Sequence, residues 1–108
     1  LQTAADEGSL SIGVDSNQNH LHPGKVLTSM LKRVDNAVYK AMTDGPEMET
    51  GFNVMGIANG GIDYAMDEHN APLVDASLKD EIDGVAAKIA SGELVVHDYM
   101  SDNACPVE

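Results

Sequence analysis

The chain has 108 residues, 43% of them hydrophobic and 22% charged, a composition typical of one globular domain. Six Lys and Arg against eighteen Asp and Glu give a net charge of −12 at pH 7, which opposes sequence-independent binding to nucleic acid or to an anionic membrane surface. No run of eighteen apolar residues that could span a bilayer occurs, and the single Cys105 cannot form an intrachain disulfide bond.

The first eight residues predict the end of a helix, with good helix formers leading to Gly8. So short a helix is marginal by itself, and we therefore expect its first turns upstream of Leu1, in a longer protein. Next, 10–15 predicts a buried strand, because a short run rich in β-branched residues precedes a polar loop. Ligands of open α/β sheets bind beyond the carboxyl ends of strands, so Asp15 is a candidate binding residue; an Asx-turn is the alternative interpretation.

Residues 26–31 fit a strand and also continue a helical stripe of apolar positions, and we favour the strand. A helix is then predicted from its N-cap Asp35 to Met42, ended by Gly45. Lys32, where this strand closes, is the second candidate binding residue. It can offset the charge of a nearby carboxylate and donate hydrogen bonds to a ring nitrogen or carbonyl; the alternative is a surface lysine at a helix start.

The second half of the chain predicts a β-hairpin, a helix and a last strand. The hairpin consists of strands over 52–57 and 62–66, with two glycines in its turn. The helix covers 78–91 with Ser77 as its N-cap, and the last strand covers 94–97 before an irregular polar tail. The alternation of short strands and helices indicates an α/β fold.

The residue chemistry favours binding over catalysis. A carboxylate such as Asp15 can accept two hydrogen bonds from a vicinal diol, which is sugar-binding chemistry. His20 and His22 near Asp15, with 67–69 further along, offer metal ligands, but their spacing matches no established metal motif. No serine lies in a nucleophile elbow, and the glycines of 56–61 match no phosphate-binding pattern. A metal-dependent hydrolase using His20, His22 and Asp15 stays open as an alternative.

Four motifs resemble the basic membrane protein (PnrA-like) family of substrate-binding proteins from bacterial ABC importers. They are Ile12–Gln18, Pro23–Asp35, Gly60–Ala65 and Ala90–Leu94, in the family's order and spacing. The resemblance implies a type I periplasmic-binding-protein fold, in which two α/β lobes joined by a hinge close on the ligand. It further implies that this sequence is the C-terminal portion of such a protein, and that a fragment divided in this way folds poorly alone. Expected boundaries are 1–31 in the second lobe, 32–50 as the hinge and first-lobe return, and 51–108 mainly in the second lobe.

The resemblance also implies a function. A purine nucleoside would bind between the lobes, with Asp15 on the ribose hydroxyls and Lys32 beside the base, and would be delivered to an ABC permease without catalysis or a cofactor. The protein would be periplasmic, or a lipoprotein anchored at the outer face of the cell membrane. Asn17 stands where the family's motif often has Asp. A ligand sensor or regulator on the same fold, with no transport role, is the alternative.

Overall fold

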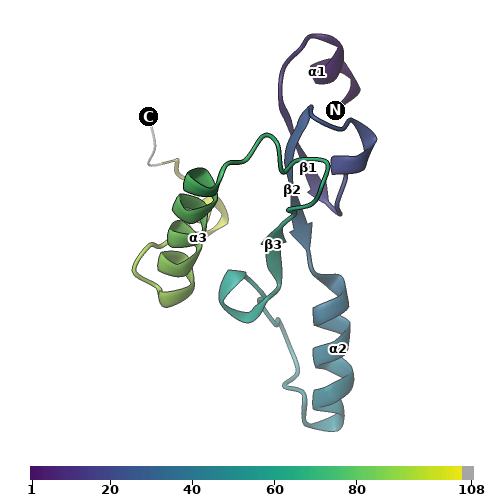
Figure 1. Ribbon diagram of the computed structural model, residues 1–108. Coiled ribbons are helices and arrows are strands. Elements are labelled where there is room, and N and C mark those ends of the chain that lie inside the picture. Colours follow the sequence, from purple (N-terminus) through teal and green to yellow (C-terminus); the bar gives the residue numbers. More distant parts are fainter. Residues whose placement is uncertain (106–108) are drawn as a thin grey trace.

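A three-stranded sheet lies at the centre of the computed structural model, which describes residues 1–105 (Figure 1). Its strands lie in the order β1 (Ser11–Asp15), β2 (Val26–Lys32) and β3 (Ile62–Tyr64). β1 pairs with β2 in parallel, whereas β3 pairs with β2 in the antiparallel direction. The strands predicted at the first two places are confirmed, and so is a mixed α/β fold.

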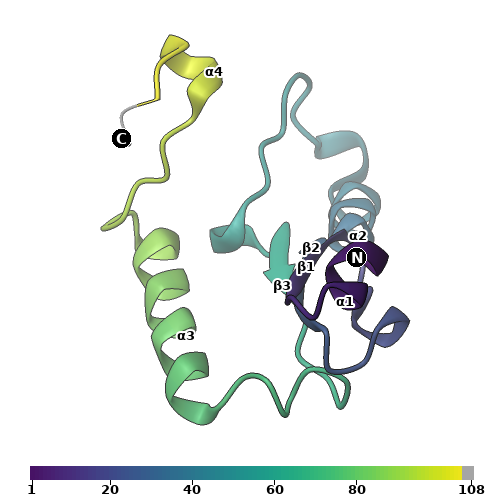
Figure 2. The ribbon, with the colours of Figure 1, turned by 90° about the horizontal axis from the view of Figure 1, so that it is seen from above.

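The helices leave the sheet in different directions. They are α1 (Gln2–Asp6), α2 (Val34–Asp44), α3 (Ala76–Ser91) and α4 (Tyr99–Asp102), with 3₁₀ turns η1 (Asn19–Leu21), η2 (Gly45–Glu47) and η3 (Ile57–Asn59). In both views α2 and α3 stand on opposite sides of β3 (Figures 1 and 2), and Figure 2 shows α4 beyond the end of α3, away from the sheet. Within residues 1–105, no helix combines the length and the apolar character that crossing a membrane requires.

The N-cap of α2 is Arg33, two residues before the predicted Asp35. The helix begins at Val34, and Asp35 lies in its first turn instead of capping it. The reason is the side chain of Arg33, which donates to both carboxylate oxygens of Asp35, at 3.0 and 2.9 Å, and so occupies the groups a cap would use. Gly45, in a positive-φ conformation, ends the helix as predicted.

The start of α3 is also corrected. Asp75, not Ser77, is its N-cap, and the Asp75 carboxylate accepts a hydrogen bond from the backbone N–H of Leu78 at 2.8 Å. Ser77 therefore lies inside the first turn. Gly92, at φ +78°, ends the helix in the left-handed conformation that glycine adopts at low cost.

The predicted hairpin is wrong, although its second strand, 62–66, forms in part as β3. Residues 52–56 are irregular and lead into η3, while β3 pairs with β2 through Met30 opposite Tyr64. β2 offers an unpaired edge once β1 has taken the other, so β3 satisfies its backbone groups there. Gly60, one of the two glycines of the predicted turn, adopts a positive φ of +71°. Gly61 serves close packing instead, since a Cβ there would overlap Met55.

The last predicted strand, 94–97, is wrong as well. This segment is irregular, and Val95 and Val96 are exposed. Among the described residues no sheet edge pairs with it, and β-branched composition alone cannot form a ladder. The polar tail after it contains the short α4, and its final residues, 106–108, lie outside the described part.

The apolar core is small. Within the described chain only Val26, Ala65 and Val74 are buried hydrophobic residues, and Ile12 and Val14 of β1 are 57% and 52% exposed, so burial of this strand was wrongly predicted. The radius of gyration is 16.6 Å, whereas a compact domain of this length has about 13 Å. The accessible surface is 7928 Å², roughly 2,000 Å² more than expected for a compact protein of this mass. Large apolar side chains exposed in this way are typical of surfaces that contact another protein or another part of the same protein.

Two glycine-to-alanine substitutions should change stability in opposite directions. Gly61→Ala should lower the free energy of unfolding by about 1–3 kcal/mol, because the new Cβ would overlap Met55. Gly84→Ala in α3 should raise it by roughly 0.5–1 kcal/mol, because a Cβ there meets open space and alanine favours the helix. Urea denaturation of the two variants checks this, and a shift of both in the same direction would contradict the packing described here.

Candidate functional site

The two candidate binding residues lie together at one edge of the sheet. Asp15 ends β1 and Lys32 ends β2, and the parallel register sets Asp15 opposite Leu31. Because the carboxyl ends of parallel strands meet at the same edge, the two side chains are neighbours. The Lys32 Nζ lies 2.9 Å from the Asp15 Oδ1. The structure therefore brings these residues together, while their role in binding a ligand stays a prediction.

This ion pair is open to solvent. The side chains of Asp15 and Lys32 are 65% and 62% exposed. An exposed pair of this kind contributes about 0–1 kcal/mol, so a ligand can separate it at small cost. The contact uses one carboxylate oxygen, and an ionised carboxylate accepts about four hydrogen bonds in all. The pair thus combines a free acceptor with a nearby cationic donor.

The backbone of Asp15 is unusual for a residue that has a side chain. Its φ is +75°, in the left-handed region. For an L-residue this conformation costs of order 1 kcal/mol, and Asp and Asn are the side chains that tolerate it best. The left-handed turn ends β1 and begins the loop that follows. Surrounding contacts must therefore hold this conformation.

A hydrogen-bonded polar cluster lies beside the site. The carboxylate of Asp67 accepts from Asn17 Nδ2 at 2.7 Å, from Asn19 Nδ2 at 3.2 Å and from the backbone N–H of His69 at 2.9 Å. The Asn17 hydrogen bond is the main cause that lowers the pKa of Asp67, and the other two act in the same direction. Because the pKa of Asp67 is lowered in the folded state, its ionised carboxylate stabilises the fold at neutral pH. This stabilisation is lost as the pH falls through that pKa. The segments involved are about 50 positions apart, and no sequence signal indicates that they meet.

The metal-binding alternative finds no cluster of ligands. Among residues 1–105, no three His, Cys, Asp or Glu side chains converge as metal ligands would. His20 is exposed within η1. Asp67, a predicted ligand candidate, accepts hydrogen bonds from Asn17 and Asn19 instead. The arrangement of His20, His22 and Asp15 that a metal-dependent hydrolase needs is therefore not formed.

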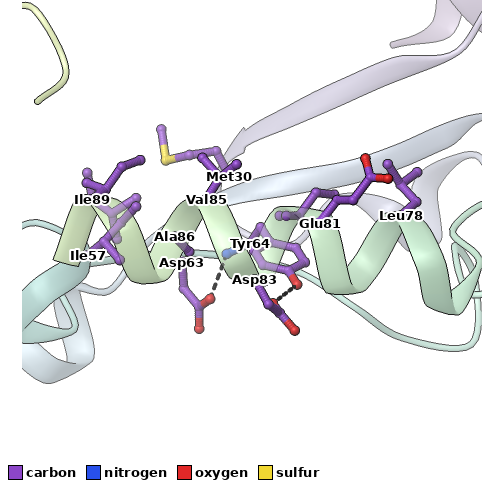
Figure 3. Close-up of a pocket in the computed structure, with 12 residues that line it drawn as sticks. Met30, Ile57, Asp63, Tyr64, Leu78, Glu81, Asp83, Val85, Ala86 and Ile89 are labelled. Atoms are coloured by element: carbon purple, nitrogen blue, oxygen red, sulfur yellow. Dashed lines mark hydrogen bonds between the residues drawn. The ribbon is translucent and has the colours of Figure 1, made fainter. Parts of the chain in front are cut away.

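A separate apolar groove of about 540 Å³ lies between α3 and the sheet (Figure 3). One wall is an apolar face of α3, and the other comes from β2, η3 and β3. Its apolar lining includes Met30, Ile57, Ile62, Leu78, Ile82, Val85, Ala86 and Ile89. At its polar rim the hydroxyl of Tyr64 donates to Asp83, as Figure 3 shows. Neither Asp15 nor Lys32 lines the groove, so it is distinct from the candidate site.

No protein-family model matches the chain, and no curated protein matches it in sequence. Among solved structures, the chain is similar to a solute-binding protein of an ABC transporter system from Aeropyrum pernix K1, with a TM-score of 0.62 and 24% sequence identity. The match covers 93% of this chain and 37% of that chain, so our sequence spans little more than a third of its length. The chain therefore has the fold of part of a solute-binding protein.

Substitutions at Asp15 should separate the cost of its charge from the cost of its backbone. Asp15→Asn should lower the free energy of unfolding by less than about 1 kcal/mol, because the ion pair is exposed and Asn tolerates a left-handed φ. Asp15→Val should cost at least about 1–2 kcal/mol more, because a β-branched residue is strained at this φ. Urea denaturation measures both, and equal losses would show that Asp15 does not need its left-handed backbone.

Proposed function

We propose that the chain is the C-terminal portion of an extracytoplasmic solute-binding protein of an ABC importer. Such a protein captures a purine nucleoside between two lobes and delivers it to a permease, without catalysis. The observation that carries the proposal is the Asp15–Lys32 pair at adjacent carboxyl strand ends, in a chain with the fold of part of a solute-binding protein. Periplasmic or lipid-anchored placement at the outer face of the cell membrane follows from the same role.

The geometry of the pair suits a nucleoside. Asp15 accepts hydrogen bonds from the two ribose hydroxyls, each worth roughly 1.5–3 kcal/mol because the acceptor is charged. Lys32 donates to a ring nitrogen or carbonyl of the base. Since the pair is exposed, the ligand exchanges a weak ion pair for several directed hydrogen bonds. Closure of the two lobes on the ligand then removes water from these bonds and strengthens them.

The charge of the chain favours an uncharged solute. The net charge is −12, and the one lysine at the site is already paired with a carboxylate. A phosphate group would meet repulsion from the whole chain, and within the described part the site lysine is already held by a carboxylate. We therefore propose a nucleoside as the ligand, not a nucleotide or a sugar phosphate.

The path of the chain supports a hinge near Lys32. β2 ends there, α2 and the irregular segment after it extend away from the sheet, and the chain returns as β3 (Figure 1). We propose that 1–31 belongs to the second lobe, 32–50 to the hinge and first-lobe return, and 51–108 mainly to the second lobe. An excursion that leaves and re-enters one sheet is what a two-lobe protein with several hinge crossings requires.

The exposed apolar surface supports a longer protein. The groove beside α3 and the exposed faces of β1 carry large apolar side chains, and the chain exposes roughly 2,000 Å² more than a compact protein of its mass. The chain matches about a third of a solute-binding protein, so the rest of such a protein could cover this surface. We propose that the remaining, N-terminal portion of the same protein covers these surfaces.

Thermal unfolding of the full-length protein tests the ligand. Adenosine, guanosine or inosine at a thousand times the dissociation constant should stabilise it by about 4 kcal/mol. Ribose alone and adenosine monophosphate should give much smaller shifts. Protein unfolded and refolded before the assay excludes ligand carried through purification. Absence of a shift with every nucleoside in that preparation would contradict nucleoside binding.

The role of Asp15 is tested with the same ligands. Asp15→Asn should weaken nucleoside binding more than tenfold, or about 1.4 kcal/mol. Asp80→Asn is the matched control, because it makes the same charge change on exposed α3. If the two variants bind within a factor of two of each other, Asp15 does not contact the ligand.

Recombining two portions tests the domain assignment. The 108-residue chain alone should unfold with weak cooperativity, because only three apolar residues of its described part are buried. Addition of the separately produced N-terminal portion should give a complex that unfolds in one transition, measured by circular dichroism and size-exclusion chromatography. A cooperative transition of the chain alone, unchanged by the other portion, would contradict the assignment.

A further inference from the structure

Three polar residues beside the candidate site are completely buried: Asn19, Ser29 and Asn70. A buried polar group that lacks a hydrogen bond costs about 1–3 kcal/mol, so such groups persist only where they are well paired. In the described chain every buried side-chain nitrogen and oxygen has a partner. The three residues therefore form an ordered network in place of apolar packing.

The network joins the loop after β1 to the strand beside it. The Ser29 hydroxyl accepts from the backbone N–H of Gln18 at 3.0 Å and donates to Asn19 Oδ1 at 2.8 Å. The Gln18 Oε1 in turn accepts from the backbone N–H of Val14 at 3.3 Å. A Cβ at Gly13 would come within 3 Å of Ser29 and Gln18, so glycine is needed for this close approach.

Asp67 connects this loop to the segment after β3. Its Oδ2 accepts from Asn17 and Asn19, and its Oδ1 accepts from the backbone N–H of His69. Its own backbone N–H donates to Asn70 Oδ1 at 2.9 Å, and Asn70 Nδ2 donates to the carbonyls of Ala65 and Leu27. Asp67 thus links Asn17 and Asn19 of the loop to the buried side chain of Asn70.

Asp15 lies at the end of β1, just before the loop that this hydrogen-bond network holds. It lies two residues before Asn17, and its φ of +75° is held only if the turn after it is held. The Asp15 side chain itself is exposed, and among residues 1–105 its one side-chain contact is the ion pair with Lys32. Its direction is therefore determined by the backbone of the loop.

We propose that Asp67 is a positioning residue for the ligand site, one that orients the Asp15 carboxylate toward a vicinal diol without touching the ligand. This inference rests on the proposed function, and it assigns the selection of ribose over 2′-deoxyribose to the Asp67 hydrogen bonds. Preorganisation of this kind lowers the entropic cost of binding and sharpens the choice between ligands that differ by one hydroxyl.

Asp67→Asn is an isosteric test in the full-length protein. The new amide would turn its NH₂ toward the NH₂ groups of Asn17 and Asn19, or toward the N–H of His69 if it flipped, so at least one donor meets a donor. Asp83→Asn is the matched control, because that carboxylate also accepts two side-chain hydrogen bonds but lies on α3, away from the loop.

Two measurements are made on both variants. The first is the ratio of affinities for adenosine and 2′-deoxyadenosine, which should fall at least fivefold in Asp67→Asn and stay unchanged in Asp83→Asn. The second is hydrogen exchange of the backbone N–H groups of Val14, Gln18 and Asn19, which should become faster only in Asp67→Asn. The double substitution Asn17→Asp with Asp67→Asn reverses one hydrogen bond and should restore part of the ratio.

The outcomes are distinguishable. An unchanged ratio with faster loop exchange would mean that the network only stabilises the fold, and unchanged exchange would mean that Asp67 does not hold the loop; either overturns the inference. Wild-type protein that binds no nucleoside would instead contradict the proposed function, and the inference with it. If Asp67→Asn fails to fold, the exposed Asn17→Ala removes the shortest of these bonds and is measured in the same way.

Discussion

The parallel pairing of β1 with β2 is the constraint on which the rest of the structure depends. A parallel pair requires the chain to return from the carboxyl end of one strand to the amino end of the next, usually through about a dozen residues or more and often through a helix. Here residues 16–25 make this return with only a 3₁₀ turn. So short a crossover carries backbone polar groups over the sheet. The buried Ser29 hydroxyl accepts from one of them, the backbone N–H of Gln18, and donates to the buried side chain of Asn19. The polar network is thus the consequence of the topology.

The elements with strong local signals could be predicted from the sequence. β1 and β2 are short apolar runs bounded by polar loops, and α3 combines an apolar stripe with a glycine stop, so both kinds of element were correctly placed. Residues 52–57 and 94–97 have equal strand propensity but form no strand, because a strand needs an edge to pair with. β3 takes the free edge of β2 with only three residues, and local sequence does not reveal that competition.

The candidate site also contains residues that the sequence identifies and residues that it does not. Asp15 and Lys32 were identifiable because each closes a strand-like run, and a parallel register then makes them neighbours. The Asp67 cluster could not be identified, because its hydrogen bonds join loops about 50 positions apart whose residues have no period or motif. The sequence presented Asp67, Glu68 and His69 as possible metal ligands, whereas the geometry assigns the first to amide donors.

An exposed ion pair on a rigid frame is a suitable arrangement for reversible capture. If the pair were buried, separating it would leave desolvated charges and would oppose ligand entry. If the loop were loose, each binding event would have to order it again and would lose affinity. Here the charges remain in solvent, while the backbone that carries Asp15 is fixed by buried hydrogen bonds. The ion pair separates at low cost because it is exposed, and the loop needs little ordering on binding because its hydrogen bonds are already formed. These two properties come from different parts of the same strand pair, so a small set of polar residues can provide both release and selectivity.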